Sequence, residues 1–178
     1  MVPMNDGAEG ADTREFVITR LFNAPRQRVW QAFTEAERLA QWWGPKGFKM
    51  MVTKLDLRPG GTFHYGMRPP AGSPMGEIMW GLFVYREITP PERIVFVNSF
   101  SDEQGGITRH PMAPDWPQEM LNVITFEEED GKTRVTLRGG PIHCTPEEAD
   151  TYHSNYPSMR GGFGGTFDQL DAYLAAGA

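Results

Sequence analysis

Apolar residues recur at alternating steps of three and four along the last part of the chain, from 146 to 175. This spacing keeps them on one face of a helix. The run Thr145-Pro146-Glu147-Glu148 predicts where that helix begins, because it has the form of a capping box with proline at the first helical position. A helix with one apolar face needs an apolar partner, and the preceding segments are mostly strand-like. The stripe consists of Ala149, Tyr152, Tyr156, Met159, Phe163, Thr166, Leu170 and Tyr173.

Two features interrupt this helical pattern. Pro157 lacks a backbone donor and crowds the carbonyl of His153, so the helix is expected to kink or restart near Tyr156. Four glycines then follow, at a combined cost of about 4 kcal/mol in helix propensity relative to alanine. Projected on a helical wheel, two of them flank the stripe and two point the opposite way. Either they make room for a ligand and for a close neighbour, or packing on the sheet tolerates them. They are Gly161, Gly162, Gly164 and Gly165.

The rest of the chain alternates short helical patterns with strand-like runs. A first strand over 15–22 is followed by Asn23-Ala24-Pro25, which opens a short helix. Thr34-Glu35-Ala36-Glu37 has the form of a second capping box, and Gly44-Pro45 ends the helix that it starts. Further strands are expected over 48–57, 62–67, 77–88, 94–100, 120–127 and 132–138. This order predicts an α+β chain with its helices on one face of an antiparallel sheet.

Composition narrows the classes of function. The formal net charge is −6 and basic residues form no cluster, which argues against nucleic acid as a partner. No apolar run has the length of a signal peptide or a membrane span, so we expect a cytoplasmic protein without membrane insertion. Cys144 is the one cysteine, which excludes a disulfide framework within the chain. The length suits one domain, expected over 14–176 after a disordered tail over 1–13.

Patterns of metal or nucleophile chemistry are missing from the sequence. The histidines stand at positions 64, 110, 143 and 153, with no spacing typical of metal ligands, so neither a metal nor another cofactor is predicted. The sequence also has no nucleophile elbow or phosphate-binding loop. An enzyme would have to use general acid–base chemistry from scattered residues such as His64, Tyr65, Glu77 or His110. Nothing in the sequence favours one of them.

Several stretches in fixed order carry a family resemblance. They read ITRLFNAPRQRVWQAF, LAQWWGPKGF, LDLRPGGTFHYGM, GLFVYREITPPERIVF and SMRGGFGGTFDQLDAYL, and together span roughly 14–175. The chain resembles the SRPBCC helix-grip superfamily of START-type and birch-pollen-allergen-type proteins. Within it, the chain is similar to bacterial proteins like the activator of the heat-shock-protein ATPase (Aha-type). Where many relatives carry tryptophan in the last helix, this chain has Phe163.

The resemblance implies a helix-grip fold. In this fold a curved antiparallel sheet of about six to seven strands wraps around a long C-terminal helix, and two short helices follow the first strand. The superfamily includes ligand carriers, cyclases, hydrolases and chaperone regulators, so a shared fold does not fix the function. We expect a protein that binds a small hydrophobic or amphipathic molecule. The alternatives are an interaction module that contacts a chaperone ATPase and a cyclase- or hydrolase-type enzyme that uses the same cavity.

The expected cavity lies between the sheet and the last helix. In the strand 62–67, Phe63 and Tyr65 share one face and His64 lies on the other. The sequence leaves this register open, although aromatic bulk favours Tyr65 inward. Of the adjacent Trp42 and Trp43, one is expected in the core and the other at the cavity. The candidate ligand-binding residues are Trp43, His64, Tyr65, Trp80, Phe96, His110, Met120, Phe163 and Phe167.

Two further regions have open interpretations. The segment 101–117 is long for a loop within a compact domain, and it is either an ordered lid over the cavity or a surface excursion. Gly161 and Gly165 form a smooth surface on the back of the last helix. Either the 101–117 loop or the same surface of a second copy would pack there, unless the glycines are simply exposed. The family resemblance leans towards a homodimer.

Overall fold

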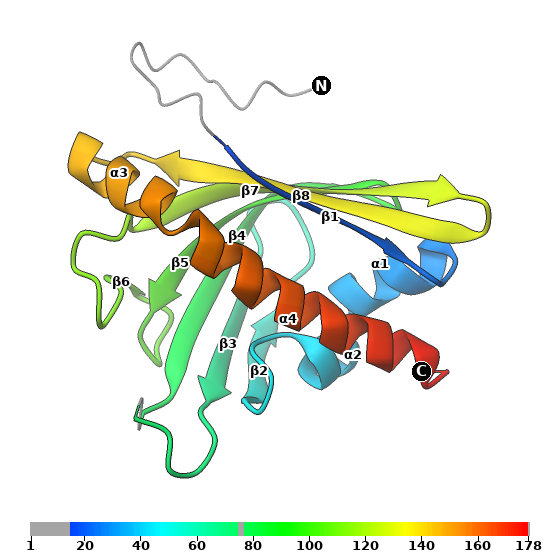
Figure 1. Ribbon diagram of the computed structural model, residues 1–178, viewed down its shortest axis with the longest axis horizontal. Coiled ribbons are helices and arrows are strands. Elements are labelled where there is room, and N and C mark those ends of the chain that lie inside the picture. The colour runs from blue at the N-terminus through cyan, green and yellow to red at the C-terminus, as the bar shows by residue number, and fades with distance from the viewer. Residues whose placement is uncertain (1–14, 75–76, 178) are drawn as a thin grey trace.

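The computed structural model describes residues 15–74 and 77–177, so the tail expected over 1–13 lies outside the described residues. The helix-grip architecture is confirmed (Figure 1). A strand and two short helices come first, then antiparallel strands, then helices. The elements are β1 (Phe16–Phe22), α1 (Arg26–Thr34), α2 (Ala36–Trp42), β2 (Lys49–Leu55), β3 (Thr62–Arg68), β4 (Met79–Thr89), β5 (Arg93–Ser101), β6 (Ile107–Thr108), β7 (Glu119–Glu129), β8 (Lys132–Ile142), α3 (Pro146–Ser154) and α4 (Tyr156–Ala175).

All the strands belong to one antiparallel sheet. Seven of them follow the order β1-β8-β7-β5-β4-β3-β2, and the two-residue strand β6 pairs with β5 beside this path. The sheet is strongly curved, and α4, coloured orange to red in Figure 1, runs across it. Helices α1 and α2 lie near the C-terminal end of α4. The space between the curved sheet and these helices holds the core.

The last helical region consists of two helices that meet at Asn155. The predicted capping box is present at the start of α3: the Glu148 amide donates to Thr145 Oγ1 at 3.1 Å, and the Thr145 amide donates to Glu148 Oε1 at 2.9 Å. The predicted restart near Tyr156 is also confirmed, and Pro157 lies in the first turn of α4. Proline is tolerated there because the first amides of a helix have no intrahelical acceptor.

The second predicted capping box is wrong. Helix α2 begins after Glu35, which makes no side-chain capping hydrogen bond. Thr34 is instead the last residue of α1, and its hydroxyl donates to the carbonyl of Trp30 at 2.8 Å. A threonine that is still helical turns its hydroxyl back to the preceding turn. It therefore cannot cap the helix that follows.

Polar contacts hold α4 on both of its flanks. On one flank, the Arg20 guanidinium lies 2.7 Å from a carboxylate oxygen of each of Asp168 and Asp171. On the other flank, the side chains of Thr166 and Gln169 donate to the carbonyl of Gly44. The helix is thus fixed both to β1 and to the loop after α2.

The back of α4 has no neighbour within the part of the chain that the structure describes. A β-carbon built at Gly161 or Gly165 would meet nothing within 4 Å. The expectation that the 101–117 loop packs there is therefore wrong. The reason is that the loop lies against α3, where Arg109 Nη1 is 2.9 Å from Glu148 Oε2 and the Trp116 ring is 5.4 Å from Tyr152. The second alternative, a copy of the same surface, stays a prediction.

Candidate ligand-binding cavity

A cavity of about 130 Å³ lies between the sheet and α4. Its wall is mostly aromatic and aliphatic, with a few uncharged polar groups. Strands β3, β4, β5, β7 and β8 form one side, and α1, the end of α2 and α4 close the other. The lining residues are Phe33, Trp43, Tyr65, Phe83, Phe96, Asn98, Asn122, Ile124, Leu137, Phe163 and Phe167. A void of about 10 Å³ lies beside it and shares several of these walls.

The structure brings together some of the candidate residues and separates others. Those that line the cavity are Trp43, Tyr65, Phe96, Phe163 and Phe167. Those that do not are His64, Trp80, His110 and Met120. Met120 is buried on the inner face of β7, but it lies two residues before Asn122, beyond the cavity wall.

Tyr65 faces the cavity because of a glycine on the neighbouring strand. Phe63 and Tyr65 stack on the inner face of β3 with ring centroids 4.7 Å apart. Gly81 of β4 pairs directly with Tyr65, and a β-carbon at Gly81 would lie 2.5 Å from the tyrosine hydroxyl oxygen. The absence of a side chain at Gly81 therefore lets the Tyr65 ring lean across β4 into the cavity.

The Tyr65 hydroxyl is neutral in the folded protein. Burial raises its pKa to about 12, an effect that a hydrogen bond with the Trp43 side chain partly offsets. Indole nitrogen can only donate, so the tyrosine oxygen accepts this bond. Trp43 thus both lines the cavity and donates a hydrogen bond to Tyr65. The adjacent Trp42 is buried in the core, where its Nε1 donates to the Ala32 carbonyl at 3.0 Å.

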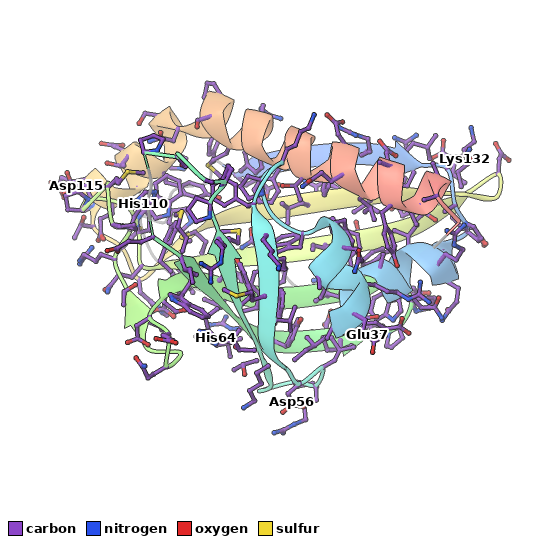
Figure 2. The ribbon with its side chains drawn as sticks, turned by 90° about the horizontal axis from the view of Figure 1, so that it is seen from below. Glu37, Asp56, His64, His110, Asp115 and Lys132 are labelled. Carbon is purple, nitrogen blue, oxygen red and sulfur yellow. The ribbon has the colours of Figure 1, made fainter. Side chains whose placement is uncertain are left out.

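His64 and Trp80 lie together on the opposite face of the sheet from Tyr65. Their rings stack with centroids 5.3 Å apart and an interplanar angle of 11°. An irregularity in the β2–β3 register places the Thr53 hydroxyl against His64 Nδ1, and His64 Nε2 lies 3.0 Å from the Asp102 carbonyl oxygen. His64 is therefore a buried structural group that ties β3 to the turn after β5 (Figure 2).

His110 belongs to the loop next to α3 (Figure 2). Its ring packs on Phe100 with centroids 4.6 Å apart, and its Nδ1 accepts from the Met112 amide at 3.0 Å. Burial lowers its pKa below the ordinary value for histidine. The loop is ordered by these contacts, and none of its residues lines the cavity.

The polar group that the sequence analysis missed is a pair of asparagines, Asn98 on β5 and Asn122 on β7. Asn122 Nδ2 donates to Asn98 Oδ1 and to the Met120 carbonyl. A β-carbon at Gly139 would lie 2.2 Å from Asn122 Oδ1, so the missing side chain makes room for the amide. The available signal was an asparagine at an inward position of each of two otherwise apolar strands, in VFVNSF and MLNVITF.

Two general features of the described residues bear on function. Within 15–74 and 77–177, histidine, cysteine, aspartate and glutamate side chains form no group of three or more that could hold a metal ion. Over the same ranges, none of the helices combines the length and the apolar character needed to cross a membrane.

Solved structures of similar proteins share this architecture. Protein Ms6760 from Mycobacterium smegmatis is 29% identical, with a TM-score of 0.71 and 90% of each chain covered. A protein from Arthrobacter aurescens is 24% identical, with a TM-score of 0.72 over 91% of this chain and 86% of the other. The AHSA1 protein from Silicibacter pomeroyi is 17% identical, with a TM-score of 0.68 over 93% of this chain and 100% of the other.

No curated protein matches the chain. A family model does match, over residues 23–175, which include both short helices, strands β2 to β8 and the helices that follow them. The chain therefore belongs to the family described as Activator of Hsp90 ATPase homolog 1-like protein.

Proposed function

We propose that this protein binds a small, largely apolar molecule in the cavity between the sheet and α4. The observation that carries the proposal is the cavity itself, about 130 Å³ of space with aromatic and aliphatic walls and a few uncharged polar groups. Ligand sites in proteins have this character: mostly apolar walls and a small number of placed polar groups. The family name describes a chaperone activator, and a contact with a chaperone ATPase stays the alternative function.

The energetic cost of the cavity supports this proposal. An enclosed, unfilled cavity reduces stability by about 24 cal/mol per Å³, so 130 Å³ corresponds to at most about 3 kcal/mol. That is a substantial part of the net stability of a typical domain. Larger side chains at the wall would remove the cost. A cavity that lowers stability is therefore consistent with a role in ligand binding.

The chemistry of the wall favours binding over acid–base catalysis. Tyr65 is the ionisable residue in the cavity lining, and its pKa of about 12 keeps it protonated at neutral pH. A general acid or base works best with a pKa near the operating pH. The cavity thus offers hydrogen bonds and shape, which suit a carrier or sensor.

Native mass spectrometry of gently purified protein tests this proposal. We expect a population with the mass of the chain plus one small organic molecule, which disappears after extraction with organic solvent. Benzene, added as a probe, should then raise the melting temperature of the extracted protein. If only the bare mass appears and benzene leaves the melting temperature unchanged, the proposal is wrong. A pull-down with a chaperone ATPase tests the alternative function separately.

A further inference from the structure

The orientation of the Asn98–Asn122 pair decides which polar atoms face a ligand. The Met120 carbonyl can only accept, so the Asn122 atom that contacts it at 3.3 Å is Nδ2. The same Nδ2 contacts the Asn98 side chain, whose facing atom must therefore be Oδ1. This leaves Asn98 Nδ2 at the other end of its amide. Among the described residues it has no hydrogen-bond acceptor, so Asn98 offers a donor to the cavity.

The Tyr65 hydroxyl offers a second donor. Its oxygen accepts from the Trp43 indole, and its own proton makes no hydrogen bond among the described residues. The hydroxyl overlies Gly81 of β4, the strand between β3 and β5, and Asn98 stands on β5. The two donors thus come from β3 and β5, on either side of β4, and both residues line the same cavity.

We infer that the ligand is a neutral carbonyl compound of about one ring, such as a small ketone, ester or lactone, whose oxygen accepts hydrogen bonds from Tyr65 and Asn98. This inference rests on the proposed function. A carbonyl oxygen has two lone pairs and can accept both bonds at once. A ligand without an acceptor would leave two buried donors without partners, which lowers affinity.

Charge excludes other ligand classes of similar size. Among the described residues, the cavity lining includes no lysine, arginine, histidine, aspartate or glutamate. A carboxylate or an ammonium group would therefore lose its hydration without gaining an ion pair, and burying an unpaired charge is strongly unfavourable. Fatty acids and amines are poor ligands for such a wall.

The volume of the cavity indicates the size of the ligand. An apolar cavity of about 150 Å³ accommodates benzene, so about 130 Å³ suits a single six-membered ring. Steroids and long-chain lipids need cavities of several hundred Å³. The walls that bound this space are rigid aromatic rings, including Phe83 and Phe96, which stack with centroids 4.1 Å apart.

Calorimetric titration of the whole protein with matched one-ring probes tests the inference. Cyclohexanone carries the carbonyl, and methylenecyclohexane has nearly the same shape without an acceptor. Two net hydrogen bonds correspond to a preference of about tenfold or more for cyclohexanone. Cyclohexanecarboxylate and cyclohexylamine at neutral pH should bind at least about tenfold more weakly than cyclohexanone.

Two variants test whether the preference for cyclohexanone comes from the Tyr65 and Asn98 donors. Tyr65→Phe keeps the ring over Gly81 and removes the hydroxyl, and Asn98→Leu removes the amide. Each should reduce the preference for cyclohexanone by about threefold or more while methylenecyclohexane still binds. Tyr85→Phe is the matched control, because Tyr85 is equally buried but lines the neighbouring void and not the cavity. It should leave the preference unchanged.

The outcomes separate this inference from the proposed function. Equal binding of cyclohexanone and methylenecyclohexane, or tighter binding of the carboxylate, would overturn the carbonyl assignment and leave the apolar cavity standing. Failure of every probe, including the hydrocarbon, would overturn both. If a variant does not fold, the comparison of the probes on the unaltered protein still decides the question.

Discussion

Replacing Phe163 by tryptophan should raise stability and weaken ligand binding at the same time. Phe163 projects from α4 into the cavity, where it contacts Phe16 and Phe167 with ring centroids 5.7 and 6.3 Å away. A side chain that grows at this position has empty space in front of it. Most core enlargements, in contrast, meet close-packed neighbours.

The magnitude follows from the cavity volume. In a close-packed interior an indole takes up roughly 40 Å³ more than a phenyl ring, which is about a third of the 130 Å³ available. At 24 cal/mol per Å³ this filling contributes about 1 kcal/mol to the free energy of unfolding. For a chain of this length that gain raises the melting temperature by about 2–4 °C.

Thermal unfolding followed by circular dichroism measures the stability change, and calorimetric titration with benzene measures binding. Phe126→Trp is the matched control. Phe126 is fully buried between Trp30 and Phe33 and does not itself line the cavity, so enlarging it should destabilise the protein by about 1–3 kcal/mol. If Phe163→Trp destabilises the protein as much as the control and benzene binds as before, the space beside Phe163 is not an available cavity.

Three further predictions concern the scaffold. Thr145→Ala should lower the free energy of unfolding, measured by chemical denaturation, by about 1 kcal/mol, because Thr145 caps α3. Thr34→Ala should lower it clearly less, because Thr34 caps no helix. Equal losses would contradict this assignment of the caps. Alanine at Gly161 and Gly165 should raise stability by up to about 1 kcal/mol each, because no described neighbour obstructs the added carbon. A loss of stability, or of dimer mass in light scattering, would instead indicate that this face of α4 is packed. Burial lowers the pKa of His110, so the folded protein resists its protonation, and stability should fall as the pH drops from about 6.5 towards the lower folded pKa. His110→Asn should flatten this pH dependence, and an unchanged slope would show that His110 does not cause it.

Local signals in the sequence predicted the order of elements but could not distinguish two similar motifs. Thr145 and Thr34 both begin a T-x-x-E pattern. Thr145 has extended backbone geometry and caps α3, whereas Thr34 is still part of α1. The difference depends on where the previous helix ends. That depends on the packing of α1 against the core, which the four residues of the motif do not encode.

The cavity was predicted in place but only partly in composition. Trp80 was expected to line the cavity because tryptophan adapts to apolar ligands, yet the small Gly81 faces inward instead and leaves room for Tyr65. This arrangement joins residues on two strands, and the pattern of either strand alone does not contain it. Asn98 and Asn122 were missed for the opposite reason. A polar residue in an apolar strand usually indicates a face towards solvent. The hydrogen bond between the two amides, which makes an inward position favourable, is visible only in the structure.

A crystal structure of the protein with bound cyclohexanone tests the central claim most directly. We expect density for one ring between Phe96 and Phe163, with its oxygen within hydrogen-bonding distance of Tyr65 Oη and Asn98 Nδ2. A ring bound elsewhere, or a cavity closed by the aromatic side chains with no ligand density at saturating probe, would contradict it.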